Sequence, residues 1–159
     1  MDLISTRTIE FATLGLDGLS ARHKAISSNI ANADTPDYKR VDVTFEDQLS
    51  KIINTEDLKE NQRLINSMGM NNTIDNILSN NQPKAPLSVN YNESFMKMSD
   101  FNPQTVESDE NAPNTNGNTV NIEQEMSSLT KNGMSYNALA NLQSREFKSL
   151  AEIIRGGNV

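Results

Sequence analysis

Residues 5–32 read STRTIEFATLGLDGLSARHKAISSNIAN, a stretch without proline in which seven positions follow one another at alternating spacings of three and four. These positions form the N-terminal seam: Ile9, Ala12, Leu16, Leu19, His23, Ile26 and Ile30. All but His23 are apolar, and this spacing places a narrow apolar stripe on one side of a helix, as in a coiled coil. The stretch predicts a long helix that needs a partner and ends before Pro36, because proline disfavours helical backbone in the residue before it.

The other end of the chain repeats the pattern. The positions of this C-terminal seam are Ile122, Met126, Leu129, Gly133, Tyr136, Ala140, Gln143, Phe147, Leu150 and Ile154. Asn121 can cap the start of a helix, and Arg155 before two glycines suits its end. We therefore expect a mainly α fold in which long N- and C-terminal helices pair as an antiparallel coiled-coil hairpin.

The middle of the chain differs in composition from both ends. Residues 54–118 contain fifteen asparagines and carry −5 of the net charge of −7. The alternation over residues 87–91 predicts a short strand, and residues 102–118 resemble a flexible loop. The predicted organisation is an N-terminal helix, a turn and a short helix in residues 1–53, an irregular, partly disordered middle in 54–118, and a C-terminal helix in 119–159.

Composition excludes several classes of protein. Only 35% of the 159 residues are hydrophobic and 5% aromatic, whereas globular domains carry roughly 45–50% apolar residues when glycine is counted. A chain with a net charge of −7 is repelled by nucleic-acid phosphates and by anionic membranes. The chain has no cysteine, so it has no disulfide or thiolate chemistry. Its first residues do not resemble a cleaved signal peptide.

Residues that could support catalysis or bind a metal are scarce. His23 is the single histidine, and its place in the seam suits a polar residue that sets register or faces a neighbouring chain. The nearest metal pattern, at Asn114, Asn116, Gly117 and Glu123, has Ala112 where a calcium loop needs its leading carboxylate. We expect no catalytic residue, no metal, no cofactor and no small-molecule substrate, and so no enzyme.

The free-energy balance of such a hairpin depends on its neighbours. Ordering the backbone costs about 1–2 kcal/mol per residue, while burial returns about 25 cal/mol per Å² of apolar surface. A lone two-helix seam buries too little apolar surface to offset that cost. The sequence therefore favours a chain that becomes ordered when other copies or partners pack around it.

A specific motif follows the first helix. Residues 27–40 read SSNIANADTPDYKR, which resembles the pattern S-N-(I/L)-A-N-x-x-T-x-G-Y-(K/R) of the bacterial flagellar axial proteins, the family of rod, hook and hook-associated proteins. The family signature comprises Ser28, Asn29, Ile30, Ala31, Asn32, Thr35, Pro36, Tyr38 and Lys39. The departure is Asp37, where the family usually has glycine, but aspartate tolerates left-handed backbone better than most residues.

The resemblance implies a structural role. The C-terminal stretch and the short length are similar to the proximal rod proteins of the family, whose members form the drive shaft that carries motor torque. The resemblance also implies export through the flagellar type III apparatus and a location in the rod, within the periplasm or cell wall. The implied partners are copies of the chain, adjacent rod proteins, and membrane-ring adaptor and export-gate components at the rod base.

Two other interpretations stay open. The chain resembles other axial rod and hook proteins as well, and a soluble helical adaptor or export chaperone would also carry amphipathic helices. The predicted assembly contacts are the apolar seam positions Ile9, Leu16, Leu19, Ile26, Ile30, Met126, Leu129, Tyr136, Phe147, Leu150 and Ile154.

Overall fold

The structure is a computed structural model that describes residues 3–67, 96–108 and 117–156. The chain divides into two compact units. The first joins the two ends of the chain, up to Leu49 and again from Phe101, and the second comprises Ser50–Asp100.

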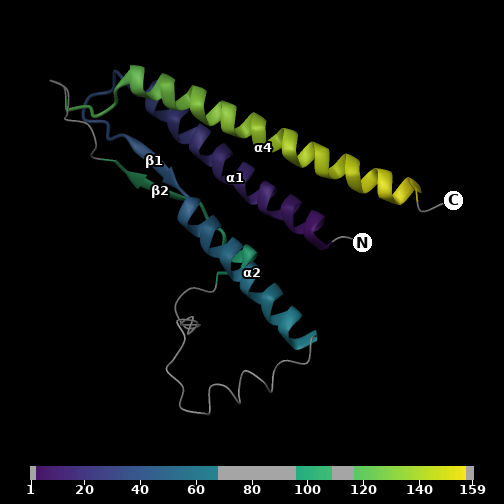
Figure 1. The fold of residues 1–159 in the computed structure, drawn as a ribbon. Coiled ribbons are helices and arrows are strands. Elements are labelled where there is room, and N and C mark those ends of the chain that lie inside the picture. Colours follow the sequence, from purple (N-terminus) through teal and green to yellow (C-terminus); the bar gives the residue numbers. More distant parts are fainter. Residues whose placement is uncertain (1–2, 68–95, 109–116, 157–159) are drawn as a thin grey trace, which may run out of the picture. The chain divides into compact units, whose positions relative to one another are not determined.

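Two long antiparallel helices dominate the first unit. Helix α1 spans Leu3–Ala31 and helix α4 spans Ile122–Gly156, and they lie side by side with the start of α1 and the end of α4 at the same end (Figure 1). Asn29 near the end of α1 contacts Glu125 near the start of α4, whereas Thr13 contacts Gln143. The predicted helical hairpin is confirmed, and α1 ends before Pro36 as expected.

The start of α4 carries the predicted cap. Asn121 Oδ1 accepts hydrogen bonds from the backbone N–H of Glu123 at 3.0 Å and of Gln124 at 3.2 Å. These are N–H groups that have no partner inside a helix. Asn121 therefore fixes the first turn of α4.

A small antiparallel sheet completes the first unit. Strand β1 spans Val41–Thr44 and pairs with β2, Gln104–Glu107, so that Val41 lies opposite Glu107 (Figure 1). The prediction of a flexible loop over residues 102–118 is wrong at β2. All four β2 residues are exposed, so the strand lacks an apolar pattern of its own and depends on backbone pairing with β1.

The core lies where α1 meets β1. It consists of Leu19, Ala25, Val43 and Phe45, and the ring of Phe101 packs edge-on against Phe45 with 6.3 Å between centroids. Two glycines of α1 allow this close packing. A Cβ on Gly15 would lie 2.7 Å from a methyl carbon of Leu139, and one on Gly18 would overlap the ring of Phe45.

Helix α2, Glu46–Ser67, runs further than the short helix predicted before residue 54. Its first turn belongs to the first unit and the remainder to the second. In the second unit, a single 3-10 turn, η1 at Met98–Asp100, follows Met96, whose N–H donates to Thr55 Oγ1 at 3.4 Å. The strand predicted at 87–91 and the other irregular segments predicted in 68–95 and 109–116 lie outside the described residues. Within the described part of the chain, no helix has the length and apolarity of a membrane span.

Candidate functional site

The family signature forms a hydrogen-bonded turn at the end of α1. Asn32 Nδ2 donates to the carbonyl of Ser28 at 2.9 Å, and the N–H of Thr35 donates to the carbonyl of Asn32 at 3.0 Å. The Tyr38 hydroxyl donates to Asn29 Oδ1 at 3.3 Å and lies 3.2 Å from the Ser28 hydroxyl. Tyr38 therefore packs back on the helix, and the chain reverses before β1.

The turn keeps its shape although Asp37 replaces the usual glycine. Asp37 has a φ of 57°, in the left-handed region that the resemblance requires at this position. Gly117 has a φ of 78°, and a Cβ added there would overlap the Asp37 carboxylate. The two residues fit together only because Gly117 has no side chain, which couples the signature to the segment before α4.

The side chain of Asn29 forms the hydrogen bonds with β1 that a neighbouring strand would form. Its Oδ1 accepts from the N–H of Val41 at 3.0 Å, and its Nδ2 donates to the carbonyl of Val41 at 2.7 Å. Arg22, about two turns earlier on the same side of α1, donates to the carbonyl of Val43. These contacts satisfy backbone groups that point away from β2. The signature asparagine thus closes one edge of the sheet, and it is fully buried.

A buried ion pair joins the signature to α4. Arg40 Nε donates to Glu125 Oε1 at 2.6 Å, and Asn29 Nδ2 lies 3.2 Å from Glu125 Oε2. Glu125 is fully buried and Arg40 is 4% exposed. Since an isolated buried charge is costly, each side chain depends on the other.

Asn118 attaches the segment before α4 to the end of α1. Its Nδ2 lies 2.9 Å from the carbonyls of Asn32 and Ala33 and 2.8 Å from that of Thr35. The next residue, Thr119, accepts the N–H of Arg40 at 2.8 Å through its hydroxyl. Three carbonyls of the turn that follows α1 are therefore contacted by a side chain from a distant part of the chain.

The sequence patterns did not identify this second half of the site. Arg40, Asn118 and Thr119 have no helical spacing, and Glu125 lies one position before the predicted seam residue Met126. A periodicity argument weighs apolar residues, so it overlooks polar ones that become buried by pairing. Among the signature residues, Ala31, Thr35, Pro36 and Lys39 are exposed, Ile30 is half-buried, and only Asn29 is fully buried.

The N-terminal seam is divided between the core and the surface. Ala12, Leu19 and Ile26 are buried, Ile9, Leu16 and Ile30 are half-buried, and His23 is exposed. The two roles weighed for His23, setting register and facing a neighbouring chain, stay predictions.

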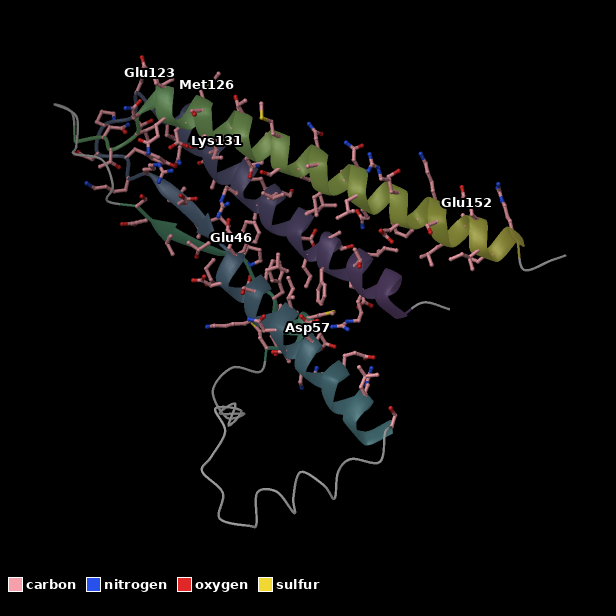
Figure 2. The ribbon with its side chains drawn as sticks, in the orientation of Figure 1. Glu46, Asp57, Glu123, Met126, Lys131 and Glu152 are labelled. Atoms are coloured by element: carbon pink, nitrogen blue, oxygen red, sulfur yellow. The ribbon has the colours of Figure 1, made fainter. Side chains whose placement is uncertain are left out.

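The C-terminal seam does not face α1 as a whole. Glu125, Asn132 and Leu139 contact α1, and each precedes a predicted seam residue by one position. One residue corresponds to a rotation of about 100° around a helix. Gln143 reaches Thr13, while Leu129 and Leu150 are half-buried. Met126, Tyr136, Phe147 and Ile154 are 52%, 42%, 53% and 69% exposed. These four side chains keep much of their surface exposed in the single chain, and Figure 2 shows Met126 near the start of α4.

A second charged cluster flanks the core. Arg22 donates to both carboxylate oxygens of Glu46, with Nη2 at 2.8 Å from Oε2, and its guanidinium lies 4.8 Å from the centre of the Phe45 ring. The hydrogen bond from Arg22 lowers the pKa of Glu46 below its usual 4.5. Elsewhere in the described segments, His, Asp and Glu side chains do not gather in threes as a metal site requires.

Comparison with known proteins decides the family. The family model for "Flagella basal body rod protein" matches residues 9–39, which hold most of α1 and the signature. The flagellar basal body rod protein FlgB of Borreliella burgdorferi is 35% identical over 94% of this chain and 96% of its own length. The FlgB proteins of Borrelia hermsii and Bacillus subtilis are 32% and 27% identical over 93% and 94% of this chain and 96% and 95% of theirs.

The chain belongs to the FlgB family of flagellar basal body rod proteins. As an FlgB-family protein it is a structural protein of the basal-body rod. The predicted resemblance to the flagellar axial proteins, and to their short proximal rod members, is confirmed. In this FlgB-family chain the matched residues 9–39 include Asn29 and Tyr38, which hold the signature turn against β1.

Proposed function

We propose that this FlgB-family chain is a subunit of the proximal rod, where its helices pack against neighbouring subunits and transmit torque mechanically rather than by catalysis. The observation that carries the proposal is the exposed apolar stripe of α4. Ile122, Met126, Tyr136, Phe147 and Ile154 share one side of the helix, and each is at least 42% exposed. A stripe of this kind marks a protein interface.

The stripe suits a repeating assembly. It lies beside the line of α4 that contacts α1, so a neighbour that covered it would extend the helix packing of the first unit. A contact between different surfaces of successive subunits, repeated without closing, generates a helical tube. Torque would then pass through packed apolar side chains, which resist compression.

The resemblance supports specific partners and a location. The partners are other copies of the chain, adjacent rod proteins, and ring-adaptor and export-gate components at the base of the rod. The proposed location is the rod in the periplasm or cell wall, reached through the flagellar type III apparatus. A net charge of −7 argues against a nucleic-acid partner.

Fractionation of intact basal bodies tests the proposal. We expect the chain to copurify with the rod in a fixed ratio to the membrane ring, and a deletion strain to lack rods and swimming. Recovery with hook or distal rod proteins, without the ring, would indicate another axial protein. A chain that stays in the cytoplasm as a folded monomer would instead indicate the adaptor or export chaperone class.

A further inference from the structure

We propose that the buried polar residues between α1 and α4 form a register lock, which selects one alignment of the hairpin at a cost in stability. The lock consists of the Arg40–Glu125 ion pair and the Asn132 amide. This role is independent of which partners cover the exposed side of α4.

The apolar residues alone do not select an alignment. The N-terminal seam repeats at three and four residues, and Glu125, Asn132 and Leu139 recur every seven residues on the line of α4 that meets α1, so a slide of one heptad keeps the same line of α4 against the same seam. The residues that complete the contact, such as Gly15 against Leu139, are small or flexible. Such a hairpin has neighbouring registers of similar energy unless polar groups distinguish them.

Asn132 lies in the middle of this contact. It is 6% exposed, and its Nδ2 donates to the Leu19 carbonyl at 3.0 Å. Its Oδ1 is buried and has no hydrogen-bond partner among the described residues. A buried carbonyl oxygen without a partner destabilises the fold, so Asn132 is not placed there for stability. A buried asparagine in a helical seam is known instead to select register.

Arg40 and Glu125 impose the same constraint at the signature end. Glu125 receives Arg40 Nε at 2.6 Å and Asn29 Nδ2 at 3.2 Å, and neither charged side chain is accessible to water. A slide of one heptad would separate Glu125 from Arg40, so that Arg40 keeps its 3.4 Å contact with Asp42 Oδ2 while the carboxylate of Glu125 loses its cation, which is far more costly than losing an apolar contact. The pair therefore penalises every alignment but one, while adding little net stability over an apolar pair.

The absence of cysteine allows a direct test by thiol cross-linking of the full-length chain. Thr13→Cys with Gln143→Cys reports the observed register, since Thr13 Oγ1 and Gln143 Nε2 are 2.9 Å apart. Thr13→Cys with Tyr136→Cys, or with Leu150→Cys, reports a shift of one heptad in either direction. Trimethylamine N-oxide is added to favour the compact state, and circular dichroism of each sample records its helix content.

In the parent chain we expect rapid cross-linking only between positions 13 and 143. A triple variant removes the lock: Arg40→Met, Glu125→Met and Asn132→Leu. In this variant we expect the cross-linking rate of a shifted pair to rise about tenfold or more, while thermal stability is unchanged or increased. A lock-free chain that retains the 13–143 cross-link alone would overturn the proposal.

The single variant Asn132→Leu still tests the proposal if the triple variant does not fold. It replaces one interface residue and removes an unsatisfied buried group, so the helices should form. We expect a stability equal to or above that of the parent, with a shifted cross-link that the parent lacks. A loss of stability with the register unchanged would show that Asn132 is only structural, which would contradict the proposal.

Discussion

At the scale of single residues, polar side chains perform tasks that backbone usually performs. Asn29 completes the edge of β1 as a third strand would, and the amide nitrogen of Asn118 lies within hydrogen-bond distance of three carbonyls in the turn after α1. One side-chain amide carries both a donor and an acceptor, which is why asparagine suits the place of a peptide group. A chain with a small core thus gains order from hydrogen bonds of defined geometry.

The Arg22–Glu46 pair makes stability depend on pH. Because Arg22 holds the pKa of Glu46 below 4.5, the pair stabilises the folded chain above that value, and this stabilisation is lost as the pH falls through the lowered pKa. We expect Glu46→Gln to lower the free energy of unfolding at neutral pH by about 1 kcal/mol or less, since the pair is partly exposed. The difference from the parent should vanish in acid.

Urea unfolding at a series of pH values measures this effect, and trimethylamine N-oxide is present here and in every other unfolding measurement so that the chain starts from its compact state. Glu152→Gln, on the exposed C-terminal part of α4 (Figure 2), is a control with the same change in charge. If both variants showed the same pH profile, the effect would come from net charge and not from the contact with Arg22.

At the scale of elements, close approach decides where glycine is required. Gly15 and Gly18 weaken an isolated helix by about 1 kcal/mol each relative to alanine. In the hairpin, Gly15 faces Leu139 of α4 and Gly18 faces the ring of Phe45, the residue after β1. These close contacts offset the lower helix propensity of the two glycines. Gly133 of α4 faces open space, with no atom within 4 Å of an added Cβ.

This contrast predicts opposite effects of one substitution. Gly18→Ala should destabilise the fold by about 1–3 kcal/mol through overlap with Phe45, less the gain in helix propensity. Gly133→Ala should raise stability by up to about 1 kcal/mol, because only the propensity changes. Denaturant midpoints of the two variants measure both. Equal stabilisation by the two alanines would contradict the close packing at Gly18.

At the scale of the whole molecule, many large apolar side chains stay exposed to solvent. The buried apolar side chains of the described residues are few: Ala12, Leu19, Ala25, Ile26, Val43, Phe45, Ile52 and Val120. The large exposed ones on α4 are as numerous. Since folding stability rests mainly on apolar burial, the chain is expected to gain much of its order from contacts with other subunits.

The first prediction at this scale concerns the isolated chain. We expect circular dichroism of the dilute monomer without osmolyte to show much less helix than α1 and α4 require, because a small core does not offset the ordering cost of two long helices. Helix content should rise with protein concentration or on assembly. A monomer that is fully helical and melts cooperatively would refute assembly-coupled ordering.

The second prediction separates assembly from folding. Phe147→Asp places a charge in the exposed stripe, so we expect loss of rod assembly and swimming while the subunit is still made and exported. Ser149→Asp adds the same charge at an exposed position off the stripe and should leave swimming unchanged. The readouts are soft-agar motility and rod counts in isolated basal bodies. Normal swimming of the Phe147 variant would rule out the stripe as an assembly surface.

The linear sequence suffices to predict four features: the two long helices, their antiparallel pairing, the Asn121 cap and the family signature. These depend on local spacing and local backbone chemistry, which a linear pattern records. Three others appear only in the folded chain: which line of α4 faces α1, that β2 forms a strand, and that Arg40, Asn118 and Glu125 are buried. Each of these depends on a partner far away in the chain, such as Glu125 for Arg40. A periodicity of apolar residues shows that a helix has a face to bury, but the polar contacts across the interface choose its rotation and register.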